Sequence, residues 1–435
     1  MITHRWDVEF TKEGRVFDDT QVTDLLAGLD GATDLLVLSH GWNNDRAEAE
    51  SLYSKLLGSL TQVGLPGSGP GSRVAVMQVL WPSKKFALSS LIPGGGAASA
   101  VDAGDQALRE SLEELTRDPE RLGEDEEDPV RRAAVDRALA TLANLDDSVD
   151  ARREYVHQIR LVLDPTQAHE DDGSVEFLTM DPEDLFDQFS QEVPVTPAAG
   201  AGGAAAISGG GAVFLGDLLS GARAAARRIA NFATYYTMKT RAGVVGQTGV
   251  ASVLLRAHDR QPGLRTHLAG HSFGGRLLTA AAATVPPRDS RLSLVLLQAA
   301  FSHNGLARRF DGTHDGAFRT ALADHRVTGP VVITHTKNDL AVGVAYPLAS
   351  RIARDKAAAI GDENDPYGGM GRNGAQHTPE VDPAVAELRK DPGDAHYAFT
   401  PGSVFNLRAD SAITGHGDVT NTAVASALRD VLTLP

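Results

Sequence analysis

The feature that most constrains the fold of this chain is a series of short apolar runs, bounded by turn-forming residues and alternating with stretches of helical periodicity. This alternation is typical of a mostly parallel sheet covered by helices, an α/β fold. The runs expected as strands are Leu35–Leu38, Val74–Met77, His267–Ala269, Leu294–Leu297, Val331–Ile333 and, closing the sheet, Val404–Leu407. The range Trp6–Phe17 is expected to form an antiparallel edge hairpin that turns at Glu13-Gly14.

The second and third runs are about 190 residues apart, far more than a connection between a strand and the next helix needs. We therefore divide the chain into the first part of the α/β core (1–85), an insertion (86–240) and the second part of the core (241–435). Helical patterns near 130–145, 151–163 and 222–239 predict a helical insertion, with Gly/Ala-rich joints. The alternative is a surface decoration or a disordered loop.

Composition excludes several classes of function. A formal net charge of −16 would repel a phosphate backbone, so no nucleic-acid partner is expected. The absence of cysteine excludes disulfides, thiolate metal sites and a cysteine nucleophile. No HExxH motif or histidine cluster indicates zinc, so neither a metal nor a cofactor is expected.

The chain is expected to be cytoplasmic, because residues 1–7 lack the charged-then-apolar pattern of a secretory signal. No stretch of about 18 strongly apolar residues predicts a transmembrane segment. The nearest candidate, Pro194–Gly216, is rich in glycine and alanine and only weakly apolar.

The sequence Gly270-His271-Ser272-Phe273-Gly274 is the pattern that most directly indicates chemistry. It follows an apolar run and precedes the helix-like stretch Arg276–Ala282, which is the context that a G-x-S-x-G nucleophile turn requires. Glycines at 270 and 274 suit a sharp turn in which nearby backbone excludes β-carbons. A serine hydroxyl also needs a base and donors for the developing oxyanion. The alternative is an ordinary glycine-rich turn.

With this turn the chain resembles the α/β-hydrolase superfamily, and within it bacterial members that carry a His-Gly-Trp/Tyr-Asn-Asn loop after an early strand. Here that loop is His40-Gly41-Trp42-Asn43-Asn44. The resemblance implies a serine nucleophile at Ser272 and an oxyanion hole formed by the backbone N–H groups of Trp42 and Phe273. The alternative is that the loop's large side chains only pack at a strand end.

The resemblance also bears on the substrate site and the insertion. The residues expected to contact the substrate are His40, Gly41 and His271. Cap insertions at this place in the sheet are frequent in the superfamily, so residues 86–240 are interpreted as a cap or lid over the active-site edge.

The family's order of catalytic residues, serine then aspartate then histidine, implies Asp339 as the acid. Asp339 follows the strand-like run that ends at Thr334. The alternative is a turn aspartate that caps a helix beginning near Ala341.

The base implied by the same order is His416, which lies between two glycines ahead of the helical stretch Thr420–Leu432. His396, placed before the last strand, is the second candidate. Asp418 is expected to cap the last helix rather than to serve as the acid.

Two further patterns are set aside. The residues Gly369–Gly374 match G-x-G-x-x-G, but no strand precedes them, so we expect a loop near the active-site mouth and not a dinucleotide site. The acidic cluster Asp362–Asp365 does not match the alternating spacing of a calcium loop and is expected to be a solvated turn.

The expected activity is hydrolysis of carboxylic esters, esterase- or lipase-like, through an acyl-enzyme. The segments Phe86–Ile92 and Ala212–Leu215 would give a lid apolar surface, suiting a small-molecule or lipid acyl ester and peripheral contact with lipid. Packing of these segments in the core is the alternative. Other acyl hydrolases (thioesterase, phospholipase or amidase) and a non-catalytic scaffold are the competing functions.

Overall fold

The computed structural model describes residues 2–64, 73–83, 100–190, 221–289, 291–339, 367–391, 393 and 396–434. Within these ranges a seven-stranded sheet has the order β1-β3-β2-β4-β5-β6-β7, and its paired strands are all parallel. The strands are β1 Ile2–Glu9, β2 Asp34–Ser39, β3 Val74–Leu80, β4 Arg265–His271, β5 Leu292–Leu297, β6 Val331–His335 and β7 Val404–Arg408. The predicted α/β architecture is confirmed, since the six apolar runs lie in β2 to β7.

The prediction for the N-terminal edge was correct for the turn but wrong for the strand that pairs with β1. Strand β1 is an edge strand, but it pairs in parallel with β3, with Trp6 opposite Met77. The turn at Gly14 is real, with φ of 79°, and a single antiparallel bridge joins Phe10 to Val16. The local turn signal was therefore read correctly, whereas the partner of β1 lies far away in the sequence.

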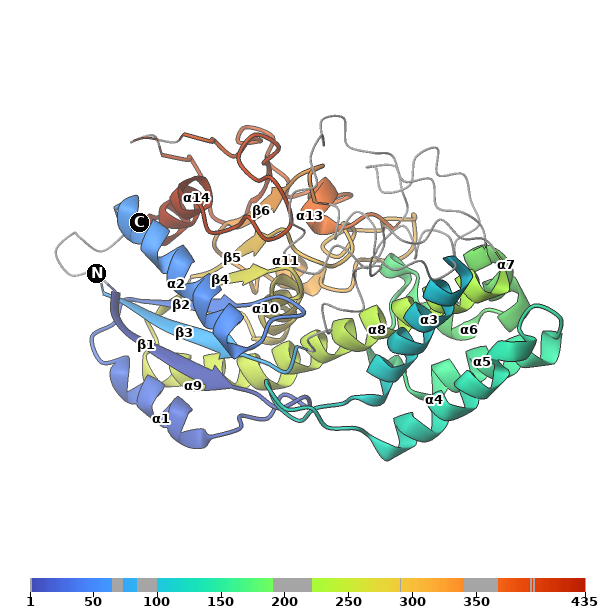
Figure 1. Cartoon of the computed structure of the whole chain (residues 1–435). Helices are drawn as coiled ribbons and strands as arrows, with labels where there is room; N and C mark the ends of the chain where they lie inside the picture. Colours follow the sequence, from blue (N-terminus) through green and yellow to red (C-terminus); the bar gives the residue numbers. More distant parts are fainter. Residues whose placement is uncertain are drawn as a thin grey trace.

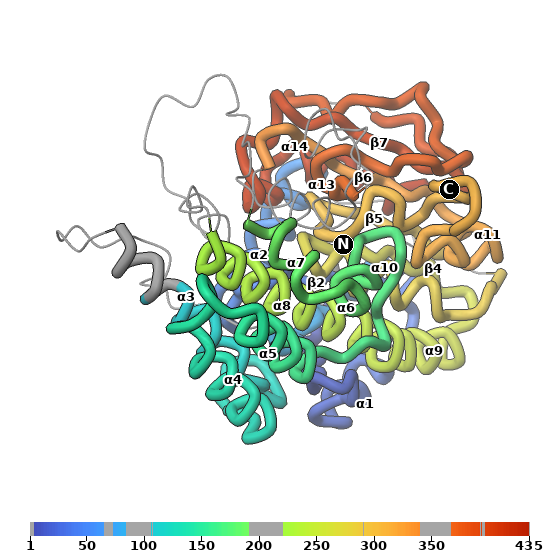
Figure 2. Tube along the Cα trace, turned by 90° about the vertical axis from the view of Figure 1, so that its right-hand side faces the viewer, coloured from blue at the N-terminus to red at the C-terminus, as the bar shows by residue number. Residues whose placement is uncertain are grey.

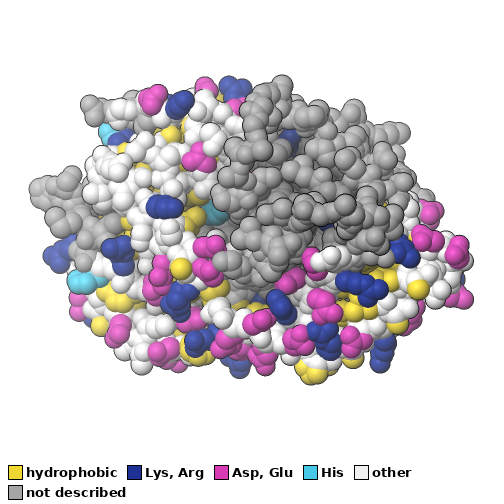
Figure 3. Space-filling view, in the orientation of Figure 1, with side chains coloured by type: hydrophobic (Ala, Val, Ile, Leu, Met, Phe, Trp, Pro, Cys, Tyr) yellow, Lys and Arg dark blue, Asp and Glu magenta, His cyan; other side chains and the backbone are white. Residues whose placement is uncertain are grey.

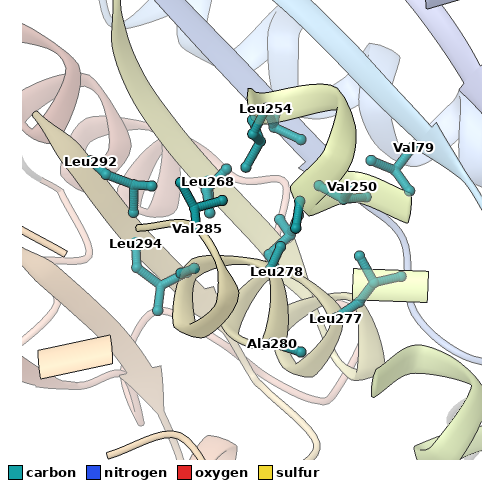
Figure 4. Close-up of a cluster of buried hydrophobic side chains, with 14 of the residues drawn as sticks. Val79, Val250, Leu254, Leu268, Leu277, Leu278, Ala280, Val285, Leu292 and Leu294 are labelled. Carbon is teal, nitrogen blue, oxygen red and sulfur yellow. The ribbon is translucent and has the colours of Figure 1, made fainter. Parts of the chain in front are cut away.

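Alternating side chains along the strands separate two apolar layers. Leu35 and Val37 of β2 pack with helices α1 (Asp19–Gly28), α9 (Ala251–Arg260) and α10 (Phe273–Thr284). Leu36 and Leu38 face the other layer, with helices α2 (Arg46–Gln62) and α14 (Thr422–Thr433). Helices therefore cover both faces of the sheet (Figure 1). Figure 4 shows the first layer, in which Leu278 of α10 lies near Leu268 of the sheet and Leu277 lies on the side of Val79 and Val250.

Most of the described residues between β3 and β4 form a helical bundle with its own buried apolar cluster. Its helices are α3 Ala100–Thr116, α4 Pro129–Thr141, α5 Val149–Leu161, α6 Ser174–Thr179, α7 Pro182–Ser190 and α8 Ala222–Val244. The three predicted helical stretches lie in α4 with the short turn after it, α5 and α8. Figure 2, viewed from the bundle side, shows α5 and α8 in front of the sheet. The segments 86–92, 194–211 and 212–215, to which joints and apolar lid surface were assigned, lie outside the described residues.

Helix α8 joins the bundle to the sheet. It continues through a π-helical turn, Val245–Val250, into α9, so one helical run passes from the bundle to the core. The turn lies very close to α10, because a β-carbon on Gly246 would stand 2.1 Å from the Leu277 carbonyl oxygen. Lys239 of α8 is 1% exposed and forms an ion pair with Asp172 of the bundle. Its carbonyl oxygen accepts from Nε of Arg276 on α10 at 3.0 Å.

The described surface carries charges of both signs. Acidic and basic side chains are interspersed over the described part of the face in Figure 3. In the described ranges, no helix is both long and apolar enough to cross a membrane.

Two short helices lie in the connections between the later strands. Helix α11 is Thr320–Ala323, and α13 is Met370–Asn373, which packs against the end of β6. The backbone N–H of Thr336, just beyond β6, donates to the carbonyl oxygen of Gly371 at 3.0 Å. The G-x-G-x-x-G stretch therefore forms a short helix beside the loop that follows β6.

Candidate active site

Ser272 lies at a sharp turn between β4 and α10. Its backbone has φ of 57° and ψ of −125°, a conformation that residues other than glycine rarely adopt. Three hydrogen bonds fix this turn: the Ser272 N–H donates to Leu297 O at 3.1 Å, and the Ser272 carbonyl oxygen accepts from Gly275 and Ala300, both at 3.0 Å. A strained conformation held this firmly is typical of functional sites.

The glycines of this turn are required by close backbone approach. A β-carbon on Gly270 would lie 2.4 Å from Gly274 O, and one on Gly274 would lie 2.4 Å from the carbonyl oxygen of His40. Real β-carbons essentially never come nearer than 3.0 Å to such atoms. The steric reason given for these two glycines from the sequence is therefore confirmed.

The structure brings together Ser272, His416 and Asp339 at the carboxyl-terminal edge of the sheet. His416 Nε2 lies 2.9 Å from Ser272 Oγ, and His416 Nδ1 lies 2.8 Å from Asp339 Oδ2. A carboxylate can only accept, so Nδ1 carries the proton and the Nε2 lone pair faces the serine hydroxyl. Asp339 is fully buried, whereas the His416 side chain is 16% exposed. This arrangement can withdraw a proton from Ser272.

The loops that carry the acid and the base are joined by two residues that the sequence analysis missed. Asp410 Oδ1 accepts from Thr336 Oγ1 at 2.8 Å and from the Lys337 N–H at 3.0 Å. Burial would raise the pKa of Asp410, but these hydrogen bonds hold it below its usual value. Asn338 Nδ2 donates to the carbonyl oxygens of Asp410 and Ile413, at 3.0 and 2.8 Å. Asp410 lies two residues beyond the last strand, and a carboxylate near a strand end was the available signal.

The loop after β2 lies directly against Ser272. A β-carbon on Gly41 would stand 2.7 Å from Ser272 Cβ, and the rings of Trp42 and Phe273 meet edge to face at 5.9 Å. Phe273 is the first residue of α10, where N–H groups have no partner inside the helix and the helix dipole is positive. An oxyanion beside Ser272 would be stabilised at this position.

The His40 ring is fully buried behind this loop. Nδ1 donates to Gly41 O at 2.9 Å, and Nε2 accepts from the Trp81 N–H at 3.4 Å. The Trp81 indole donates to His40 O at 3.0 Å, and the two rings stack. Burial lowers the pKa of His40 to about 4, so the ring is neutral at neutral pH. Of the two residues of this loop that were expected to contact the substrate, Gly41 lies against Ser272. The His40 ring has no exposed surface through which it could contact a substrate.

The other candidates lie elsewhere. His396 is away from Ser272, its Nδ1 2.7 Å from Asp430 of α14. The capping role expected of Asp418 was wrong: its carboxylate accepts from Thr414 at 3.0 Å, while Asn421 caps α14 by accepting from the Val424 N–H at 3.1 Å. Residues 341 and 362–365 lie outside the described ranges, so the helix near the acid and the acidic turn stay predictions.

Comparison with known proteins gave no match: no family model, no curated protein and no solved structure is detectably similar to this chain. In the described ranges, no group of three or more His, Asp or Glu side chains is arranged to hold a metal ion. Function is therefore inferred from the geometry around Ser272.

Proposed function

We propose that this protein is a serine hydrolase of the α/β-hydrolase superfamily that cleaves carboxylic esters through an acyl-enzyme on Ser272. The observation that carries the proposal is the hydrogen-bonded series from Asp339 through His416 to Ser272. The three residues follow β6, β7 and β4, at the edge of a parallel sheet where ligands bind in open α/β folds. Its substrate is a small-molecule or lipid acyl ester.

The first half-reaction acylates the serine. Ser272 Oγ attacks the ester carbonyl carbon while His416 Nε2 takes the hydroxyl proton, and Asp339 stabilises the imidazolium. The carbonyl oxygen becomes an oxyanion that accepts hydrogen bonds from the Trp42 and Phe273 N–H groups. When the tetrahedral intermediate collapses, His416 returns the proton to the departing alkoxide, and an alcohol leaves.

The second half-reaction uses the same groups on water. His416 removes a proton from a water molecule, whose oxygen attacks the acyl carbon, and the oxyanion forms again in the same place. Collapse breaks the bond to Ser272 Oγ, which recovers its proton from His416. The products are a carboxylic acid and the free serine.

In this proposal the bundle α3 to α8 is the cap insertion of the fold. The position of α8 supports this interpretation of the bundle. The ring of Tyr235 on α8 lies 5.2 Å from the ring of Phe273, the residue after the nucleophile. The bundle thus reaches the residue next to the reacting serine. A cap at this place would contribute to the walls of the acyl site.

The test compares hydrolysis of p-nitrophenyl butyrate and p-nitrophenyl palmitate by the wild type, Ser272→Ala and Ser426→Ala. Ser426 is fully buried in α14 and serves as the matched control. We expect Ser272→Ala to lose about 10⁴-fold or more in kcat while remaining folded, and Ser426→Ala to turn over normally. The preferred chain length distinguishes an esterase from a lipase.

Two outcomes would change the proposal. Turnover that persists in Ser272→Ala would remove Ser272 as the nucleophile. Inactivity on both esters together with Ser272-dependent cleavage of an acyl-thioester would keep the nucleophile and change the substrate class.

A further inference from the structure

His271, the residue before Ser272, lies against the loop that carries His416. It is 8% exposed, and its Nε2 stands 2.9 Å from the backbone carbonyl oxygen of His416. A carbonyl oxygen can only accept, so Nε2 carries the proton. The two imidazole rings have centroids 4.8 Å apart.

The other side of the His271 ring faces the loop after β2. A β-carbon on Gly41 would stand 3.2 Å from His271 Nδ1. Among the described residues, this buried nitrogen has no hydrogen-bond partner. The ring therefore lies between the loop of Gly41 and the loop of His416. Among the described residues, its one hydrogen bond is to the loop of His416.

The His416 ring is held by Asp339 and Ser272, whereas its backbone lies between two glycines. β-Carbons on Gly415 and Gly417 would meet no atom within 4 Å, so nothing packs against these two glycines at the position of a side chain. The N–H and the hydroxyl group of Thr414 donate to the carboxylate of Asp418, which joins the two ends of this short turn. In the part of the chain that the structure describes, the bond from His271 is the one that reaches the carbonyl group of His416 itself.

The charge state of His271 suits this contact. Burial, followed by the nearby charge of His416, lowers the pKa of His271 to about 3, with a smaller contribution from His40 and partial compensation by the bond to the His416 backbone. The ring thus remains neutral while His416 takes up a proton. A second positive ring 4.8 Å away would oppose formation of the imidazolium.

We propose that His271 is a positioning residue that fixes the backbone of His416 through its Nε2–H and so sets the orientation of the base toward Ser272. The inference rests on the proposed function and replaces the expectation that His271 contacts the substrate. Nothing is transferred to or from His271 during the reaction. Its contribution is to hold the backbone carbonyl group of His416, while Asp339 holds the ring of the same residue.

The first experiment measures the rate at which a fluorophosphonate probe labels Ser272 in the wild type, His271→Gln and His271→Leu. Leucine removes the donor, and we expect labelling about tenfold slower, the size of one neutral hydrogen bond. Glutamine offers an amide N–H near the position of Nε2, so its rate is expected to return to within about threefold of wild type. The natural substrate need not be known.

The matched control is His258→Leu. His258 is 2% exposed and bonds Thr266 Oγ1 at 2.9 Å, at the opposite end of β4 from Ser272. This variant should lose stability yet label at the wild-type rate per folded molecule. Equal slowing in both leucine variants would mean general destabilisation and would overturn the proposal, as would wild-type labelling in His271→Leu or failure of glutamine to rescue it.

The second experiment tests the hydrogen bond from His271 to the His416 carbonyl group without measuring catalysis. Nitrogen NMR of ¹⁵N-histidine protein, with His271 assigned by its absence in His271→Gln, should show a neutral ring protonated at Nε2 from about pH 5 to 8. A ring that titrates in this range, or that is protonated at Nδ1, would overturn the inference. A wild type that no probe labels would refute the proposed function, while the NMR result would still decide whether His271 donates to the loop.

Discussion

Replacing Gly41 by alanine perturbs the site at the closest approach between the loop after β2 and the serine. The added β-carbon would lie 2.7 Å from Ser272 Cβ and 3.2 Å from His271 Nδ1. Moving from 2.7 Å to the 3.4 Å of an ordinary contact requires a shift of about 0.7 Å in the loop or in Ser272. Neither can retreat freely, because the Ser272 turn is held by three backbone hydrogen bonds and His40 by the Trp81 indole.

Such a shift would move the Ser272 hydroxyl group relative to the Trp42 N–H and to His416. A displacement of about 1 Å costs roughly 10²-fold in rate, and loss of one oxyanion donor costs about 10² to 10³-fold. We therefore expect Gly41→Ala to lower kcat on p-nitrophenyl butyrate by about 10²-fold. The control is Gly58→Ala in the exposed face of α2, where a β-carbon meets nothing within 4 Å and activity should be unchanged. A Gly41→Ala variant with wild-type kcat would refute the placement of this loop at the reacting centre.

The remaining predictions concern the base, the joint between bundle and core, and acid stability. His416→Ala should lower kcat by about 10⁴-fold or more while His396→Ala remains near wild type; the reverse result would move the base to His396. Lys239→Met leaves the carboxylate of Asp172 buried without its cation and should cost about 3–5 kcal/mol in urea unfolding, and a Lys239→Met/Asp172→Leu double variant should recover part of it. An unchanged unfolding midpoint in the single variant would contradict the stabilising role of the Lys239–Asp172 ion pair. His40 stays neutral in the folded state down to about pH 4, whereas an unfolded histidine takes up a proton near pH 6.5. Lowering the pH through this window should therefore reduce the free energy of unfolding by about 1.4 kcal/mol per pH unit through His40. His40→Leu should lose that part of the pH dependence, and an identical slope would contradict the burial of a neutral ring.

The sheet could be predicted from the sequence because buried parallel strands are continuous apolar runs, as in Leu35–Leu38 and Leu294–Leu297. Strand β1 was different. Its sequence, Trp6-Asp7-Val8-Glu9, alternates and leads into a turn, so local pattern favoured a hairpin. Its true partner, β3, is found only through tertiary pairing.

The candidate site was predictable to the extent that a motif specified it. The turn around Ser272 and the order of acid and base led to residues that the structure brings within hydrogen-bond distance of one another. The contacts that hold these residues in place were not predictable. Asp410 and His271 act through contacts with loops distant in the chain, and no spacing in the sequence encodes such contacts.

The helix ends show the same limit at short range. Asp45 with Glu48 forms a capping box at the start of α2. At α14, Asp418 and Asn421 were both able to cap, and the choice fell to Asn421 because the carboxylate of Asp418 is engaged by Thr414. Cap preference favoured Asp418, but the same preference includes asparagine, and only the three-dimensional contacts of Asp418 show that Asn421 is the cap.

The most direct test of the central claim is to react the protein with a fluorophosphonate and to locate the adduct by peptide mass spectrometry. We predict a single adduct on Ser272 in the wild type, none in Ser272→Ala, and labelling slowed by about 10³-fold or more in His416→Ala. An adduct on another residue that survives Ser272→Ala, or a wild type that does not react at all, would contradict the assignment of Ser272 as an activated nucleophile.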